Sequence, residues 1–150
     1  MRDAMGGSVT LIIIVVFIVI ALGYMAFNVN YTKAFRMKDK IISVYDDYNG
    51  VCTGECEAEI INYARKIGYS TGNNIQCPSN GNYDVKNNLY CIQEVNPETN
   101  KLANDAYDES EIKYYYNIVT KINLEIPVIS NVFNFRFFYI YGDTKTYKKR

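Results

Sequence analysis

The chain has 150 residues, and its 16 Lys and Arg residues balance 16 Asp and Glu residues, so the formal net charge is zero. This balance argues against nucleic-acid binding through overall charge. The chain has no His, the commonest general base and metal ligand. We therefore expect a protein that is not an enzyme, with no catalytic residue, cofactor, metal site or small-molecule substrate.

The first strong pattern is an apolar segment near the N-terminus. No charged residue occurs between Asp3 and Lys33, and residues 9–27 are almost wholly apolar. About twenty such residues span the hydrocarbon core of a bilayer. We therefore predict a transmembrane helix at 9–27 that follows a short N-terminal tail at 1–8.

A cleaved signal peptide is the alternative, because Arg2 precedes the segment and Ala21 and Gly23 have cleavage-like spacing. The helical pattern nevertheless continues beyond Gly23. Apolar residues recur at steps of three and four at Ala34, Met37, Ile41, Val44 or Tyr45, and Tyr48. We predict one helix from about Val9 to Tyr48, in which residues 28–48 are a soluble extension of the membrane span.

The chain just after the apolar segment is basic. Lys33, Arg36, Lys38 and Lys40 outnumber the single acidic residue among them, Asp39. The positive-inside rule would place this flank, and the domain that follows it, in the cytoplasm.

The cysteines favour the opposite orientation. Cys52, Cys56, Cys77 and Cys91 all follow the apolar segment. An even number of cysteines in a small domain rich in Asn and Gly is typical of two disulfides in an oxidising compartment. We therefore predict a single-pass protein of the cell membrane with a cytoplasmic N-terminus and an extracytoplasmic, disulfide-stapled α+β domain at 49–150.

Three pairings of four cysteines exist, and we favour Cys52–Cys56 with Cys77–Cys91. The first would close the tight turn "CTGEC", and the second would tie a polar loop to a strand. Pairing across the two sets is a close alternative. Zinc bound by all four cysteines is another, although the spacing lacks the tight pairs of a zinc ribbon.

The domain begins with a helix and continues into strands. In the segment 55–69, Ile60, Ala64 and Ile67 share one helical face. The segment 89–95, "LYCIQEV", predicts a short strand, and the segment 112–126 alternates apolar and polar residues as a long strand does.

A last strand follows the break at 127–131. Its apolar positions on one face are Phe133, Phe135, Phe137, Tyr139 and Tyr141. We expect this aromatic face to cover the soluble half of the N-terminal helix. The predicted fold class is α+β, with a long N-terminal helix and an antiparallel sheet of about three strands.

This plan of a hydrophobic N-terminal helix on an antiparallel sheet resembles that of type IV pilins and pseudopilins. The stretch "GGSVTLIIIVVFIVIALGYMAFNVNYTKAF" resembles the start of TadE-like pilus assembly proteins of the tight-adherence (Flp) type. The stretch "INLEIPVISNVFNFRFFYIYGDTKTY" is similar to the end of such proteins. Leu11 and Ile12 stand where prepilins carry a Glu, so an uncleaved anchor or minor subunit fits better than a major filament subunit.

The resemblance implies a membrane-anchored minor component of a tight-adherence pilus or a related secretion apparatus. Such a protein acts by assembly, and its partners are the membrane and other pilus or pseudopilin subunits, met through the transmembrane helix. The alternative is a generic membrane-anchored or secreted extracellular binding domain with no pilus role.

Overall fold

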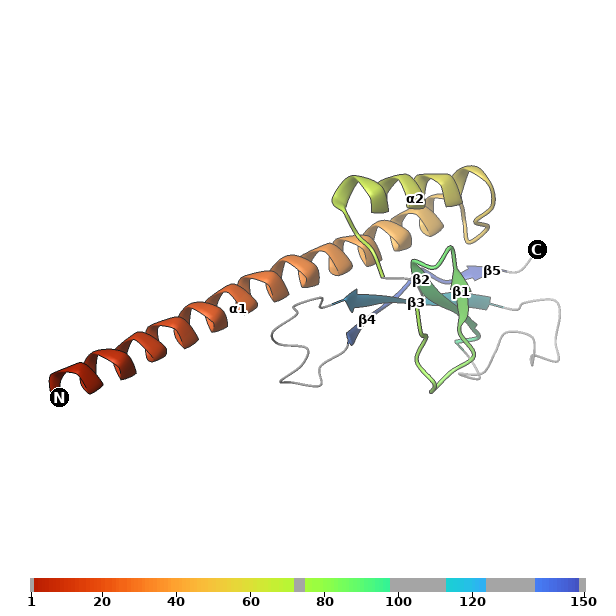
Figure 1. The fold of residues 1–150 in the computed structure, drawn as a ribbon. Helices are drawn as coiled ribbons and strands as arrows, with labels where there is room; N and C mark the ends of the chain where they lie inside the picture. Colours follow the sequence, from red (N-terminus) through yellow and green to blue (C-terminus); the bar gives the residue numbers. More distant parts are fainter. Residues whose placement is uncertain (1, 72–74, 98–112, 124–136, 149–150) are drawn as a thin grey trace.

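The computed structural model describes residues 2–71, 75–97, 113–123 and 137–148. A long helix projects from a small α+β domain, and two helices lie against an antiparallel sheet (Figure 1). The elements in chain order are α1 (Arg2–Asp47), α2 (Glu55–Ile67), β1 (Asp84–Lys86), β2 (Tyr90–Val95), β3 (Lys113–Asn123), β4 (Phe137–Asp143) and β5 (Tyr147–Lys148). The predicted α+β class with a long N-terminal helix is confirmed.

Helix α1 is uninterrupted over 46 residues, a length of about 69 Å at the usual rise of an α-helix. It contains no Pro that would break the backbone hydrogen-bond ladder. Its C-terminal half carries the buried stripe predicted from the sequence, formed by Ala34, Met37, Ile41, Val44 and Tyr45. Tyr48 is 38% exposed, so its predicted place in the stripe is wrong. The reason is that α1 ends at Asp47 and the chain turns away.

Helix α2 runs back along α1, toward the end of the domain from which the long helix projects (Figure 1). Its C-terminus is closed by Gly68 in the left-handed conformation. The backbone N–H groups of Gly68 and Tyr69 donate to the carbonyls of Arg65 and Ala64, which would otherwise lack partners. Ile60 and Ala64 are buried, as their shared helical face predicts.

The sheet has the strand order β1-β2-β3-β4, with β5 paired to the first residues of β3. The described residues thus form five strands, and the prediction of about three is corrected. The sequence reading missed β1, which is joined to β2 by a tight turn. Asn87 and Asn88 both have positive φ there, and the Leu89 N–H donates to the Lys86 carbonyl at 2.9 Å. Asn tolerates this left-handed conformation better than most residues.

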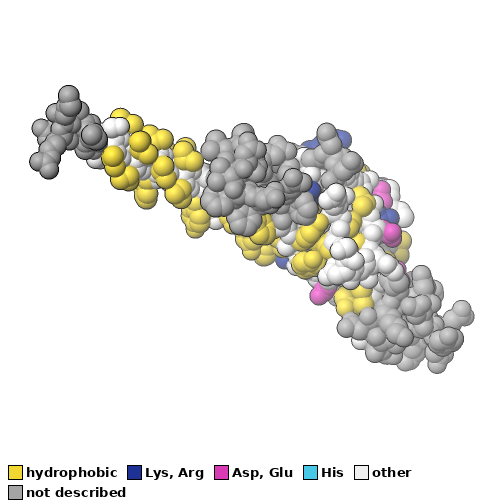
Figure 2. Space-filling view, turned by 60° about the horizontal axis from the view of Figure 1, so that its bottom comes forward, with side chains coloured by type: hydrophobic (Ala, Val, Ile, Leu, Met, Phe, Trp, Pro, Cys, Tyr) yellow, Lys and Arg dark blue, Asp and Glu magenta, His cyan; other side chains and the backbone are white. Residues whose placement is uncertain are grey.

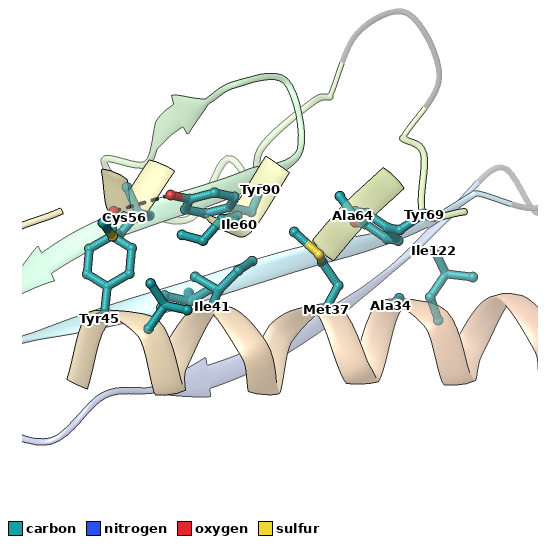
Figure 3. Close-up of a cluster of buried hydrophobic side chains, with 13 residues drawn as sticks. Ala34, Met37, Ile41, Tyr45, Cys56, Ile60, Ala64, Tyr69, Tyr90 and Ile122 are labelled. Carbon is teal, nitrogen blue, oxygen red and sulfur yellow. Dashed lines mark hydrogen bonds between the residues drawn. The ribbon is translucent and has the colours of Figure 1, made fainter. Parts of the chain in front are cut away.

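One face of the sheet packs on both helices. Ile118 and Ile122 of β3 are buried there, as their alternation predicts. The Thr120 hydroxyl between them donates to the Ala34 carbonyl at 3.1 Å. Figure 3 shows the resulting core, in which side chains of α1 and α2 meet those of the sheet.

The prediction that Tyr139 and Tyr141 cover α1 is wrong. Antiparallel pairing sets them opposite Lys121 and Val119, whose side chains point away from the helices. Alternation therefore gives the helix-facing positions of β4 to its even-numbered residues. The Phe138 ring meets Phe27 of α1 edge to face, at a centroid distance of 6.0 Å.

The other predicted members of the aromatic face are not placed. Phe133 and Phe135 lie outside the described residues, and the side chain of Phe137 is likewise not described.

A second, smaller cluster of buried apolar side chains lies on the face of the sheet that points away from the helices. Ile75, Cys91 and Val119 are buried there, with Tyr83 and Tyr139 packed against them. The loop that carries Cys77 covers this face. The sheet is therefore protected on one side by two helices and on the other by a loop held to β2.

Candidate membrane anchor and assembly surface

The N-terminal half of α1 exposes a continuous apolar surface. Its large apolar side chains between Val9 and Met25 have exposed fractions from 37% to 71%. Because these positions are almost consecutive, the exposed surface surrounds the helix. Figure 2 shows the part of this surface that lies on one face of the molecule. Of the described helices, α1 alone is long and apolar enough to cross a membrane, and only 6% of its most apolar stretch is buried. An apolar surface of this extent is unusual for a soluble monomer.

A row of aromatic rings follows this surface along α1. Phe27, Tyr31 and Phe35 are four residues apart and stack in sequence, with ring centroids 6.2 and 6.3 Å apart. Tyr31 and Phe35 remain partly exposed. Aromatic residues of this kind are enriched where transmembrane helices leave the hydrocarbon core. The row therefore marks the transition between the two halves of α1.

Polar contacts fix the soluble half of α1 to α2. The Lys33 ammonium donates to the Gly68 carbonyl at 3.2 Å, and Lys40 forms an ion pair with Glu59 at 2.6 Å. Both contacts are at the surface, where such pairs add little stability. Their role is to fix the position of α2 along α1, because they join the two antiparallel helices at two places.

The four cysteines lie in two separate places. Cys52 is bonded to Cys56 at the turn between α1 and α2, and Cys77 is bonded to Cys91 on the far face of the sheet. Their Cα atoms are 5.2 Å and 5.8 Å apart, within the range usual for disulfides. These are the pairs that the sequence analysis favours. Pairing across the sets and a four-cysteine zinc site both require contacts that this arrangement does not have.

Several tyrosine hydroxyls are buried at junctions between elements. The Tyr69 hydroxyl lies beside β3 at the point where β2 begins. It accepts from the Lys121 N–H at 3.1 Å, and its single hydrogen is shared between the carbonyls of Lys121 and Leu89. Burial raises the pKa of the Tyr69 hydroxyl well above its usual range. A hydroxyl in this state is a neutral structural partner for the backbone.

An open hollow lies beside the second cluster, between the Cys77 loop and β4. It is lined by Gln76, Cys77, Pro78, Ser79, Asn80, Tyr139 and Tyr141. The Tyr139 hydroxyl donates to the Gln76 carbonyl at 2.8 Å and so holds the loop to the strand. Sequence periodicity gives no signal for this hollow, because its shape depends on where the disulfide places the loop.

Acidic residues and cysteines do not gather into a metal site in the described part of the chain, where no group of three such side chains has suitable geometry. No protein-family model, curated protein or solved structure matches the chain. The resemblance to TadE-like and pilin-like proteins therefore rests on the sequence patterns alone.

Proposed function

We propose that this chain is a single-pass membrane protein that acts as a minor, pilin-like subunit of a tight-adherence pilus or a related secretion apparatus. Its N-terminus lies in the cytoplasm and its folded domain lies outside. One observation carries the proposal. Helix α1 passes without a break from an exposed apolar half into a half that contributes to the core of the domain.

The exposed half of α1 supports a role in assembly. Once in a bilayer, its surface of Val, Ile and Leu side chains faces lipid or another helix. Helices associate in lipid through close van der Waals packing, which a rigid side-chain surface provides. Because the helix is continuous with the domain, packing between neighbouring helices also brings neighbouring domains together.

The disulfides support the proposed location of the domain. Disulfides persist in oxidising compartments and are rare in the cytosol. The basic cluster after the span would favour the cytoplasm, but a cytoplasmic domain requires Arg2 to cross the membrane. We give priority to the disulfides, since both are built into the packing of the domain.

The test is site-specific photo-cross-linking in native membranes. A photoreactive phenylalanine analogue is placed at each position from 11 to 19 in turn, with Val85, an exposed residue of β1, as the matched control. We expect adducts with the same chain or with other single-pass subunits, recurring every three to four positions. A chain that remains in washed membranes but gives no adduct at any position would contradict the role in assembly and leave the anchor standing.

The hollow beside β4 favours one alternative, a membrane-anchored binding domain without a pilus role. Tyr139 and Tyr141 present aromatic rings there next to the polar side chains of Ser79 and Asn80. The same experiment separates the two functions when the photoreactive group is also placed at Asn80. Adducts at this position and none along the helix would favour the binding domain.

A further inference from the structure

Charge is segregated along the layer formed by α1 and α2. The first turn of α2 carries Glu55 and Glu57, whereas its last turn carries Arg65 and Lys66. Since α2 runs back along α1, its basic end lies toward the apolar half of α1 (Figure 1). The acidic end lies beside the end of α1, at the opposite side of the domain.

Basic residues of α1 lie at the same level. The contact between Lys33 and the Gly68 carbonyl places Lys33 beside the C-terminus of α2. Arg36, less than one turn farther along α1, is exposed. We call Lys33, Arg36, Arg65 and Lys66 the basic collar, because they come from two helices and gather where the domain meets the long helix.

The nearest acidic residues along the two helices are already paired. Asp39 accepts from Lys38 at 2.9 Å, and Glu59 accepts from Lys40 at 2.6 Å. The positive charge of the basic collar is therefore not cancelled by its neighbours on α1 and α2. The negative end of the α2 dipole explains a preference for cations at Arg65, but it does not explain Arg36 on the other helix.

If the proposed span crosses a bilayer, the basic collar begins just beyond the lipid headgroups, and its long side chains can reach them. From Phe27, the last residue of that span, to Lys33 the helix rises about 9 Å. The interfacial region on each side of the hydrocarbon core is roughly 5–8 Å thick. The long side chains of Lys and Arg reach back toward such an interface while their stems pack on apolar surface. Phe27 and Tyr31 occupy the zone between core and collar.

We propose that the basic collar binds the phosphates of anionic lipid headgroups in the leaflet next to the domain, and thereby seats the domain on the membrane. This inference rests on the proposed membrane anchor. It adds a ligand class to that anchor and a role for the C-terminus of α2. It also gives the basic flank of the span a partner outside the cytoplasm.

The experiment uses the full chain in nanodiscs of phosphatidylcholine, with and without about one third phosphatidylglycerol. Native mass spectrometry measures how many lipids of each kind stay bound. The collar variant is Arg36→Gln with Lys66→Gln, and the matched control is Lys145→Gln with Lys148→Gln, which removes two charges beside the end of α1, on the side of the domain opposite the collar. A basic residue near an anionic surface contributes roughly fivefold in affinity.

We expect the parent chain and the control to retain phosphatidylglycerol in preference to phosphatidylcholine. In the collar variant, the ratio of bound phosphatidylglycerol to bound phosphatidylcholine should be at least fivefold lower. Equal retention by the two variants would overturn the inference. Unchanged circular dichroism shows that each variant is folded. A chain that enters neither kind of nanodisc contradicts the anchor itself, whereas insertion into both without lipid preference contradicts the collar alone.

A second readout tests the site without any substitution. An uncharged amine-modifying reagent, which an anionic surface does not repel, is applied to both nanodiscs. We expect the modification rate of Lys66 to fall at least threefold when phosphatidylglycerol is present, while that of Lys148 stays constant. Equal rates at Lys66 in the two discs would count against headgroup binding.

Discussion

The hydroxyl oxygens of Tyr45 and Tyr90 lie 3.2 Å apart and hydrogen-bond to each other inside the core (Figure 3). Tyr45 comes from α1 and Tyr90 from β2, so the bond joins the helix that carries the exposed apolar segment to the sheet. Their exposed fractions are 4% and 0%. Burial raises the pKa of both phenols, and the side chain of Glu57 raises them further.

This pair predicts instability at alkaline pH. The pKa of a free Tyr is about 10, and in the folded chain the pKa of Tyr90 is raised. The unfolded chain therefore loses protons first, and stability that is complete below about pH 10 falls as pH rises above it. We expect the urea midpoint in detergent micelles to be constant from pH 7 to 9 and to decrease from about pH 10 upward.

The matched variant is Tyr90→Phe, which removes the hydroxyl and leaves that of Tyr45 buried without this partner. We expect it to cost about 1–3 kcal/mol at neutral pH. The stability of the variant should decrease less steeply at alkaline pH than that of the parent chain. Some decrease remains, because the pKa of the buried Tyr69 hydroxyl is also raised. An identical alkaline decline in both chains would contradict a role for this pair.

A second prediction concerns the buried stripe of α1. Met37 is fully buried between the helices and the sheet, so Met37→Ala should lower the free energy of unfolding by about 2–5 kcal/mol. Ser43 is exposed on the same helix, and Ser43→Ala should change it by less than about 0.5 kcal/mol. Urea unfolding of the full chain in micelles measures both. If Met37→Ala changed the free energy of unfolding as little as Ser43→Ala, the soluble half of α1 would not pack in the core.

A third prediction compares the two disulfides. Cys77 and Cys91 are 14 residues apart, and Cys52 and Cys56 are 4 apart. Since the entropy lost by the unfolded chain grows with the size of the closed loop, replacing the Cys77–Cys91 pair by Ser should cost about 3 kcal/mol and replacing the other pair about 2 kcal/mol. Denaturant unfolding of the two double variants gives the comparison. A larger loss on replacing Cys52–Cys56 would show that the disulfide of the shorter loop stabilises the chain more.

A fourth prediction concerns Gly50, which follows the end of α1. It has φ of +82°, and a Cβ atom there would lie 2.9 Å from the ring of Tyr147. Gly68 also has positive φ, at +64°, but its Cβ would come no closer than 3.5 Å to another atom. Gly50→Ala should therefore destabilise the chain by more than Gly68→Ala, for which we expect about 1 kcal/mol. Thermal unfolding of both variants in micelles provides the measurement, and equal losses would mean that the Tyr147 ring moves freely aside.

The last prediction concerns location and processing. In intact cells, a membrane-impermeant thiol reagent should label the cysteines only after reduction, because both pairs are bonded and the proposed orientation places them outside the cytoplasm. The mature protein recovered from membranes should also retain the apolar segment. Labelling that needs lysis and no reduction would place the domain in the cytoplasm. A mature N-terminus at Tyr24 would instead show a cleaved signal peptide.

Strong periodicity made much of this fold predictable. The stripe through Met37 and Ile41 and the alternation through Ile118 and Ile122 each bury one face, so sequence spacing is enough to identify the core. Strand β4 is different, since the run "FFYIY" is apolar at odd and even positions alike. Only its register with β3 decides which residues face α1, and that depends on contacts between distant parts of the chain.

Local signals were also overlooked. The pair Asn87–Asn88 is typical of a tight hairpin turn and would have revealed β1. The basic collar shows what sequence alone does not provide. Lys33 and Lys66 are far apart in the chain and are brought to one level only by the antiparallel packing of α2 on α1.

The unbroken course of α1 has a mechanical consequence. Because no break separates the two halves of α1, the apolar half and the half packed in the domain tilt together. If the proposed span tilts by about 20°, as transmembrane helices commonly do, the whole domain tilts by the same angle. Under the proposed function, a force that neighbouring subunits apply to the span would therefore also tilt the domain.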